Sequence, residues 1–282
     1  MTVQCRIDNV PASLNRLILL SLSAVLSFAS TAAATEGWES TVSPFAPGSF
    51  PELRSLRAKY NLGWNGVTAG HADIRFGKTA AGRLELEATG GTTGFARTLW
   101  TFDVKHVGTS DAQTLRPIEV HELERGRKKE MTTKVSFTSD RVTSVREERR
   151  ESNAKSKTRT FEFPNVFSVN SALLYLRTQP LQDGAVQRIV VYPATSAYLC
   201  TIKVRGRERI TVPTGTYDAI KVDVQLGKIG KKRELLPHKR FRRATVWLSD
   251  DPDRLILRIE TQVFVGTVYA ELQSVQFDSA KP

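Results

Sequence analysis

Side chains that could perform acid–base or metal chemistry are scattered along this sequence and form no recognisable group. The four histidines, His71, His106, His121 and His238, stand at none of the spacings typical of metal ligands, and no HExxH pattern occurs. The serine-nucleophile pattern GxSxG is absent, as are a P-loop and a GxGxxG phosphate loop. The sequence therefore predicts a protein that is not an enzyme and that holds no cofactor or metal.

Acidic residues concentrate at one place, Asp250-Asp251-Pro252-Asp253. Three carboxylates could hold Ca²⁺, but calcium loops usually alternate their oxygen ligands and include a distant Glu. An Asp before Pro, after Trp247-Leu248-Ser249, is more typical of a tight turn between two strands. Glu85 and Glu87 alternate along one strand face, which we interpret as solvated, so no carboxylate pair for glycoside cleavage is identified.

Basic residues are the most informative group. The formal net charge is +12, and Lys and Arg cluster at 125–129, 146–159, 203–209 and 228–243. Arginine suits bidentate phosphate recognition, so converging side chains could bind a phosphorylated lipid or an acidic glycan. The candidate anion-binding residues are Arg146, Arg149, Arg150, Arg205, Arg207, Arg242 and Arg243. The alternative is that the clusters occupy hairpin tips, where charge keeps strand edges soluble.

Four basic residues between 203 and 209 alternate with other residue types, namely Lys203, Arg205, Arg207 and Arg209. If they belong to one strand, all four project from a single face. Gly206 could instead mark a turn that splits them.

The N-terminus has the three parts of a secretory signal peptide. Arg6 and Arg16 precede an apolar stretch from Leu17 to about Ala29, and Thr31-Ala32-Ala33-Ala34 supplies small residues for a signal peptidase. This apolar stretch is shorter than the roughly 20 residues that a membrane-spanning helix needs. We expect residues 1–34 to be removed after Ala34, which leaves a periplasmic or secreted chain with no membrane span and a net charge of +11.

Export changes how the positive net charge and Cys200 are interpreted. Nucleic acid is not an expected partner outside the cytoplasm, and the available polyanions are lipopolysaccharide, acidic glycans and anionic lipids. Cys200 is the only cysteine after residue 34, so no internal disulfide can form. Its alternating neighbours predict a buried strand position, where Cys behaves as a small hydrophobe.

The remaining pattern predicts one β-rich domain. Residues 35–55 contain Pro44, Pro47, Gly48 and Pro51 and are expected to form a flexible leader. From 56 to 278, apolar and polar residues alternate in about a dozen short runs with turn residues between them. We expect an antiparallel meander that forms a curved sheet, a half-barrel or a barrel. Helix-forming residues with an apolar stripe predict one short helix at 168–177.

Four sequence blocks in order resemble a known bacterial family. They are Tyr60–Val67 with Ala69-Gly70, Ser171–Arg177 leading into Pro180-Leu181, Ile210–Ala219, and Val246–Asp251 continuing to Gly266 and Ala270-Glu271-Leu272. Together they resemble the bacterial family called domain of unknown function 3108, over about residues 56–278. The resemblance implies an exported, mostly β protein and brings no catalytic residues. The expected architecture is also similar to that of the periplasmic half-barrel lipoprotein carriers.

These observations favour a non-catalytic binding or accessory protein of the cell envelope that holds a lipid or acyl ligand in an apolar cavity. The alternative is a surface protein that binds polyanions such as lipopolysaccharide or acidic glycan, with affinity that falls as salt rises. A third hypothesis is a hydrolase of envelope polymers, which would need acid and base side chains that the sequence does not bring together.

Overall fold

The structure is a computed structural model that describes residues 37–48, 53–151, 153–237, 243–263 and 266–278. The predicted signal peptide and its cleavage site lie outside these residues. Within them, no helix is both long and apolar enough to cross a membrane.

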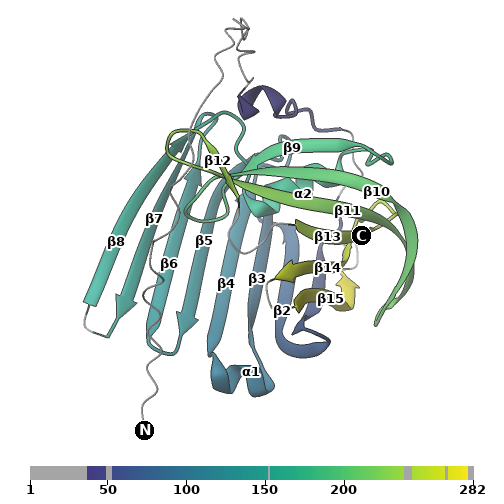
Figure 1. Cartoon of the computed structure of the whole chain (residues 1–282), viewed down its shortest axis with the longest axis horizontal. Coiled ribbons are helices and arrows are strands. Elements are labelled where there is room, and N and C mark those ends of the chain that lie inside the picture. Colours follow the sequence, from purple (N-terminus) through teal and green to yellow (C-terminus); the bar gives the residue numbers. More distant parts are fainter. Residues whose placement is uncertain (1–36, 49–52, 152, 238–242, 264–265, 279–282) are drawn as a thin grey trace, which may run out of the picture. The chain divides into compact units, whose positions relative to one another are not determined.

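Antiparallel strands joined into one sheet make up most of the described chain (Figure 1). The strands are β1 (Leu56–Trp64), β2 (Val67–Lys78), β3 (Leu84–Thr92), β4 (Phe102–Ser110), β5 (Pro117–Gly126), β6 (Lys129–Phe137), β7 (Arg141–Arg150), β8 (Asn153–Glu162), β9 (Val186–Val191), β10 (Tyr198–Val212), β11 (Gly215–Ile229), β12 (Leu235–Pro237), β13 (Arg243–Ser249), β14 (Ile256–Val263) and β15 (Gly266–Phe277). Helices are α1 (Gly94–Leu99) and α2 (Val169–Arg177), with a 3-10 turn η1 (Trp38–Thr41). The predicted mostly β, antiparallel meander is confirmed.

The order of the strands shows how the sheet is assembled. It runs β8-β7-β6-β5-β4-β3-β2-β1-β15-β14-β13-β11-β10-β9, with the short β12 beside β11. The first and last strands, β1 and β15, therefore pair in the middle of the sheet, while β8 and β9 form its edges. Since no ladder joins β8 to β9 in the described residues, the sheet is curved but not closed.

The chain passes directly from one edge strand to the other. Five residues after the end of β8, Phe167 donates its N–H to the carbonyl of Val190 at 2.8 Å, and its own carbonyl accepts from Tyr192 N–H at 2.8 Å. Five residues reach at most about 17 Å, whereas a flat sheet of this order would separate its edges by about 60 Å. The sheet must therefore curl until its edges approach.

Helix α2 follows this crossing and fills the interior of the curl. Its N-cap Ser168 is buried and accepts a hydrogen bond from the Ser171 backbone, and the Ser171 hydroxyl accepts in return from Ser168 N–H. Leu174 joins a buried cluster with β1 and β2, whereas Tyr175 and Leu176 pack with residues of β9–β11. The helix predicted at 168–177 is confirmed, and it contacts both halves of the sheet.

Several features of the sequence have a clear place in this fold. Cys200 is buried in the cluster around α2, and burial raises the pKa of its thiol to about 12. Asp251 accepts hydrogen bonds from the Ser249 hydroxyl and from the backbone of Asp253 and Arg254, which makes 250–254 the predicted turn between β13 and β14. Burial therefore accounts for Cys200, and turn formation accounts for the acidic residues of 250–253.

The segment interpreted as a flexible leader contacts the domain where it is described. Phe45 stacks on Tyr175 with ring centroids 5.5 Å apart, and Trp38 stacks on Phe163 at 5.3 Å. Ser43 N–H donates to the Arg188 carbonyl at 2.8 Å. Packing therefore begins N-terminal to residue 56, through aromatic residues whose spacing has no strand or helix period.

Two local features differ from the sequence interpretation. Helix α1 between β3 and β4 was not expected, because six residues are too few to show a helical period. Residues 198–212 form one strand with a bulge between Val204 and Gly206. Lys203 pairs with Asp223 and Arg207 with Ile220, so the bulge turns these two basic residues to opposite faces. The four basic residues do lie in one strand but do not share one face, and Gly206 marks a bulge that splits them instead of the turn that was the alternative.

The cap of α2 gives a stability prediction. Replacing Ser168 by Ala removes the hydrogen bond to the Ser171 backbone, so the protein should lose about 1 kcal/mol of unfolding free energy. For a domain of this size, the melting temperature should fall by about 2–4 °C. Differential scanning calorimetry measures both. The exposed Ser156→Ala in β8 is the matched control and should melt like the wild type. Equal melting of the two variants would contradict the role of the cap.

Candidate functional site

The face of the sheet against which α2 packs, here called the inner face, carries two cavities along β1. Leu56, Ala58 and Tyr60 line a small cavity of about 100 Å³ beneath α2. Leu62 and Trp64, which continue the same alternation, line a larger cavity of about 340 Å³. The larger cavity lies at the end of the sheet that carries α1, here called the α1 end.

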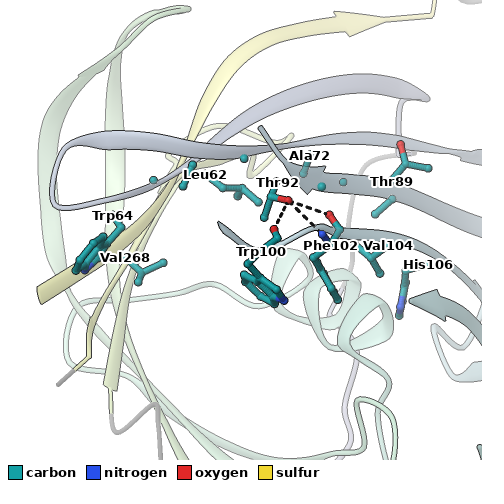
Figure 2. A pocket seen from close by; sticks show the side chains of 16 residues that line it. Leu62, Trp64, Ala72, Thr89, Thr92, Trp100, Phe102, Val104, His106 and Val268 are labelled. Atoms are coloured by element: carbon teal, nitrogen blue, oxygen red, sulfur yellow. Dashed lines mark hydrogen bonds between the residues drawn. The ribbon is translucent and has the colours of Figure 1, made fainter. Parts of the chain in front are cut away.

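The wall of the larger cavity is almost entirely apolar (Figure 2). Trp100, Phe102, Val104 and His106 follow one another along one side of it, at the start of β4. The Thr92 hydroxyl donates to the Trp100 carbonyl at 2.8 Å and accepts from Phe102 N–H at 3.2 Å. These bonds hold the beginning of β4 against the end of β3, so the aromatic side chains keep their place at the cavity.

Small residues on β2 and β3 create the hollow. Gly70, Ala72, Ala88 and Gly90 line the cavity, and Ala72 pairs directly with Gly90 across the two strands. A Cβ on Gly90 would lie 2.8 Å from the His71 carbonyl oxygen, so any larger residue there would force the backbone apart. The cavity therefore exists because the residues at its base are small, while the side chains around them are large.

Charged side chains occupy the inner face next to this cavity. His106, which lines it, lies with Nδ1 3.1 Å from Glu122 Oε2. Two residues further along β5, Glu124 accepts from Arg146 at 2.9 Å, and the same guanidinium lies 2.9 Å from Met131 Sδ. Strand registers place His106 beside Glu122, and these four polar side chains bridge β4, β5 and β7.

These groups are partly buried, and burial affects the ionisation of one of them, Glu124. Side-chain exposure is 16% for His106, 20% for Glu122 and Glu124, and 30% for Arg146. Burial raises the pKa of Glu124, and the neighbouring Glu122 carboxylate adds to this rise while Arg146 opposes it. The inner face therefore offers an apolar cavity with hydrogen-bond donors and acceptors at one margin.

Glu122 and Glu124 were not among the candidates from the sequence. Both faces of β5 carry polar residues between 119 and 125, which is unusual for a strand with one face toward a core. This departure from alternation was the signal in the sequence that could have pointed to Glu122 and Glu124. His106 was interpreted as structural, and only the register with β5 reveals its partner.

The candidate anion-binding arginines of β7 do not form one group. Arg146 lies on the inner face against Glu124, and Arg150 bonds to Glu148 near the β7–β8 turn. Arg149 is exposed and stands opposite Glu130 in the neighbouring strand.

Three of the four remaining candidates are bound to carboxylates. Arg205 and Arg243 both donate to the carboxylate of Asp223, whose side chain is 4% exposed. Arg207 bonds to Asp183 and, at 2.8 Å, to Asp250. Arg242 lies outside the described residues. The structure thus brings Arg205 and Arg243 together around a buried carboxylate, and anion binding by this set stays a prediction.

Comparison with known proteins gives a family and a fold. Residues 59–273 match the family described as "Protein of unknown function (DUF3108)", and the chain belongs to this family. No curated protein matches the sequence significantly.

Solved structures resemble this fold at low sequence identity. A β-barrel-like protein of domain of unknown function DUF1849 from Brucella abortus aligns with a TM-score of 0.56 and 10% identity, over 82% of this chain and all of that one. A candidate exported protein with a YmcC-like fold from Bacteroides fragilis gives 0.35 and 10%, over 82% and 100%. A candidate lipoprotein from Parabacteroides distasonis gives 0.32 and 12%, over 80% and 97%. The first likeness supports the β-barrel-like fold alone.

The Asp223 cluster gives a pH-dependent prediction. Burial would raise the pKa of Asp223, but hydrogen bonds from Arg243 and Arg205 outweigh burial and lower it. Asp223→Asn should therefore lower the free energy of unfolding by about 2 kcal/mol at pH 7. This loss is smaller than that for a fully buried ion pair, because both arginines reach solvent. This stability is present above the unfolded-state pKa of about 4 and is lost as pH falls through the lowered folded-state pKa. Urea unfolding at stepped pH values should show the gap between wild type and variant shrinking below pH 4.

Asp218→Asn on the same strand is the matched control, because its pair with Arg209 is exposed on both sides. It should change the unfolding free energy little at any pH. A gap for Asp223→Asn that stays constant through the acid range would refute the assigned ionisation.

Proposed function

We propose that this protein is exported and binds a lipid or another acyl-chain amphiphile on the inner face of its sheet, without catalysing a reaction. The supporting observation is the apolar cavity of about 340 Å³ at the α1 end. Its volume falls within the range of roughly 300–1,000 Å³ that is typical of small-molecule sites. Hydrocarbon would contact Leu62, Trp100, Phe102 and Val104, where burial of apolar surface supplies the free energy.

The charged group beside the cavity suits the polar part of such a ligand. Arg146 offers a guanidinium, His106 an imidazole, and Glu122 and Glu124 offer acceptors. An amphiphile lying with its chain in the cavity would reach this group through His106, which belongs to both. The proposal thus assigns one ligand to both parts of the site.

A hydrolase acting on envelope polymers is the second candidate, favoured by one observation. Glu122 and Glu124 lie on one face beside a cavity, and burial raises the pKa of Glu124, as an acid catalyst would need. We rank this candidate lower because the cavity wall is apolar and each carboxylate already has a basic partner. Binding of polyanions by the arginine set ranks lower too, because Arg205, Arg207 and Arg243 are held by carboxylates.

Filling the cavity should abolish ligand binding. Ala88→Phe places a ring among the lining residues. An overpacking cost of about 1–3 kcal/mol corresponds to a loss of affinity of about fivefold to 150-fold. Purified protein would be analysed for co-purifying lipid by mass spectrometry, and a fluorescent fatty acid would be titrated into it after delipidation.

Ala154→Phe in β8 adds the same ring at an exposed position outside the cavity and serves as control. It should bind the probe like the wild type, and both variants should keep the wild-type circular dichroism spectrum. Absence of lipid from the wild type together with no probe binding would refute the proposal. Hydrolysis of an envelope polymer that is lost in Glu124→Gln would favour the second candidate.

Export is tested at the cleavage site. N-terminal sequencing of protein recovered from the periplasm or medium of a Gram-negative host should start at Thr35. Ala34→Asp should slow processing, because a charge replaces a small residue that the peptidase contacts. Ala33→Asp lies between the two recognised positions and should be processed more nearly normally. Recovery of unprocessed wild type in the cytoplasm would contradict export.

A further inference from the structure

Large apolar side chains are exposed together at the α1 end. Nine large hydrophobic residues in the described part of the chain are exposed, and five of them belong to the β1–β2 turn and the β3–β4 connection: Trp64, Val67, Phe95, Leu99 and Trp100. Exposure reaches 77% for Phe95 and 70% for Leu99, and α1 buries none of its own residues. Figure 1 shows α1 at the extremity of β3 and β4.

Specific contacts fix α1 with these side chains outward. Arg97 donates to both carboxylate oxygens of Asp103 at 2.7 and 2.9 Å, and Arg127 donates to the Thr98 carbonyl at 3.0 Å. At the start of the helix, Thr93 N–H donates to the Ala69 carbonyl of β2 at 2.9 Å. The apolar side chains are therefore presented by a fastened element.

Basic residues lie to one side of this apolar group. The connections β3–β4, β5–β6 and β7–β8 lie at the same end because the strands form a meander. Residues 93–103, 125–130 and 148–153 contain seven Lys or Arg and four Asp or Glu. Arg127 and Lys128, at the β5–β6 turn, are exposed, and Arg127 touches α1 directly. Apolar and cationic groups thus share one end of the sheet.

We propose that the α1 end docks onto the surface of an anionic lipid bilayer. Phe95, Leu99 and Trp100 would enter the interface, where tryptophan and other amphipathic rings are favoured. Arg127 and Lys128 would lie at the headgroup level and contact lipid phosphates. An apolar group flanked by cations matches this partner better than a second copy of the chain, whose α1 end carries the same net positive charge.

The larger cavity opens into this surface. Trp64 and Trp100 line the cavity and are also members of the exposed group. Docking would therefore bring the cavity next to the bilayer, so that an amphiphile could pass between the two. This last step rests on the proposed lipid binding, whereas the exposed side chains and their charge do not.

Vesicle flotation tests the proposal, with the processed protein purified from the cells that export it. Wild-type protein should float with vesicles of phosphatidylglycerol and phosphatidylethanolamine and float much less with phosphatidylcholine alone. Phe95→Ser with Leu99→Ser, neither of which lines the cavity, should weaken binding at least about tenfold. Arg127→Ser with Lys128→Ser should weaken binding to the anionic vesicles and flatten its salt dependence.

Val186→Ser with Leu236→Ser is the matched control, since both residues are exposed but lie in β9 and β12. It should bind like the wild type. Ala88→Phe should lose the cavity ligand yet keep vesicle binding, which separates failure of the docking surface from failure of the proposed function. Unchanged flotation of the Phe95/Leu99 variant would overturn the proposal. If the wild type self-associates and this variant loses only that self-association, the exposed group would belong to an interface between copies of the chain, and the proposal would be overturned as well.

Discussion

The crossing of the chain from β8 to β9 determines the curvature of the sheet. Phe167 is hydrogen-bonded to Val190 and Tyr192 only five residues after β8 ends, so the two edge strands must lie close together at that point. The Tyr192 hydroxyl lies 3.0 Å from the Ser144 hydroxyl of β7, and Arg159 of β8 donates to the Thr195 carbonyl at 3.0 Å. Side chains and one short bridge thus replace a closing ladder.

Curvature in turn divides the inner face. Near the crossing, α2 and the aromatic residues of 38–45 fill the curl, and only a small cavity is left beneath the helix. At the α1 end, no helix of the described residues fills the curl in this way, and small residues on β2 and β3 deepen the hollow further. Toward the α1 end, the inner face is mostly apolar on β1–β4 and carries Glu122, Glu124 and Arg146 on β5 and β7, so an amphipathic site arises from the register of neighbouring strands.

Local sequence patterns predicted the features that depend only on residues close together in the sequence. Alternation in runs such as Leu84–Ala88 gave the strands, and Ser168 with the stripe after it gave α2. The turn at 250–254 and the burial of Cys200 followed from equally short stretches. The family was identified from four such blocks together, and it extends over residues 59–273.

The site could not be predicted in the same way, because it depends on which strands are neighbours. His106 meets Glu122 sixteen residues away, and Asp223 meets Arg205 and Arg243 from the two strands that flank it. The bulge at Gly206 also reversed the parity of the basic residues that follow it. No periodicity contains this information, since register is set by turns, bulges and packing across the whole sheet.

The distribution of positive charge follows from the same registers. Arg146, Arg205, Arg207 and Arg243 face carboxylates. At Asp223 the physical reason is that a buried carboxylate without partners would be costly to desolvate. Pairing of this kind contributes no net charge. In the described part of the chain, positive charge beyond these pairs lies on other residues, and exposed turn residues such as Arg127 and Lys128 carry part of it. Binding of anions by the paired arginines therefore stays a prediction, whereas the proposed bilayer docking relies on exposed turn residues such as Arg127 and Lys128.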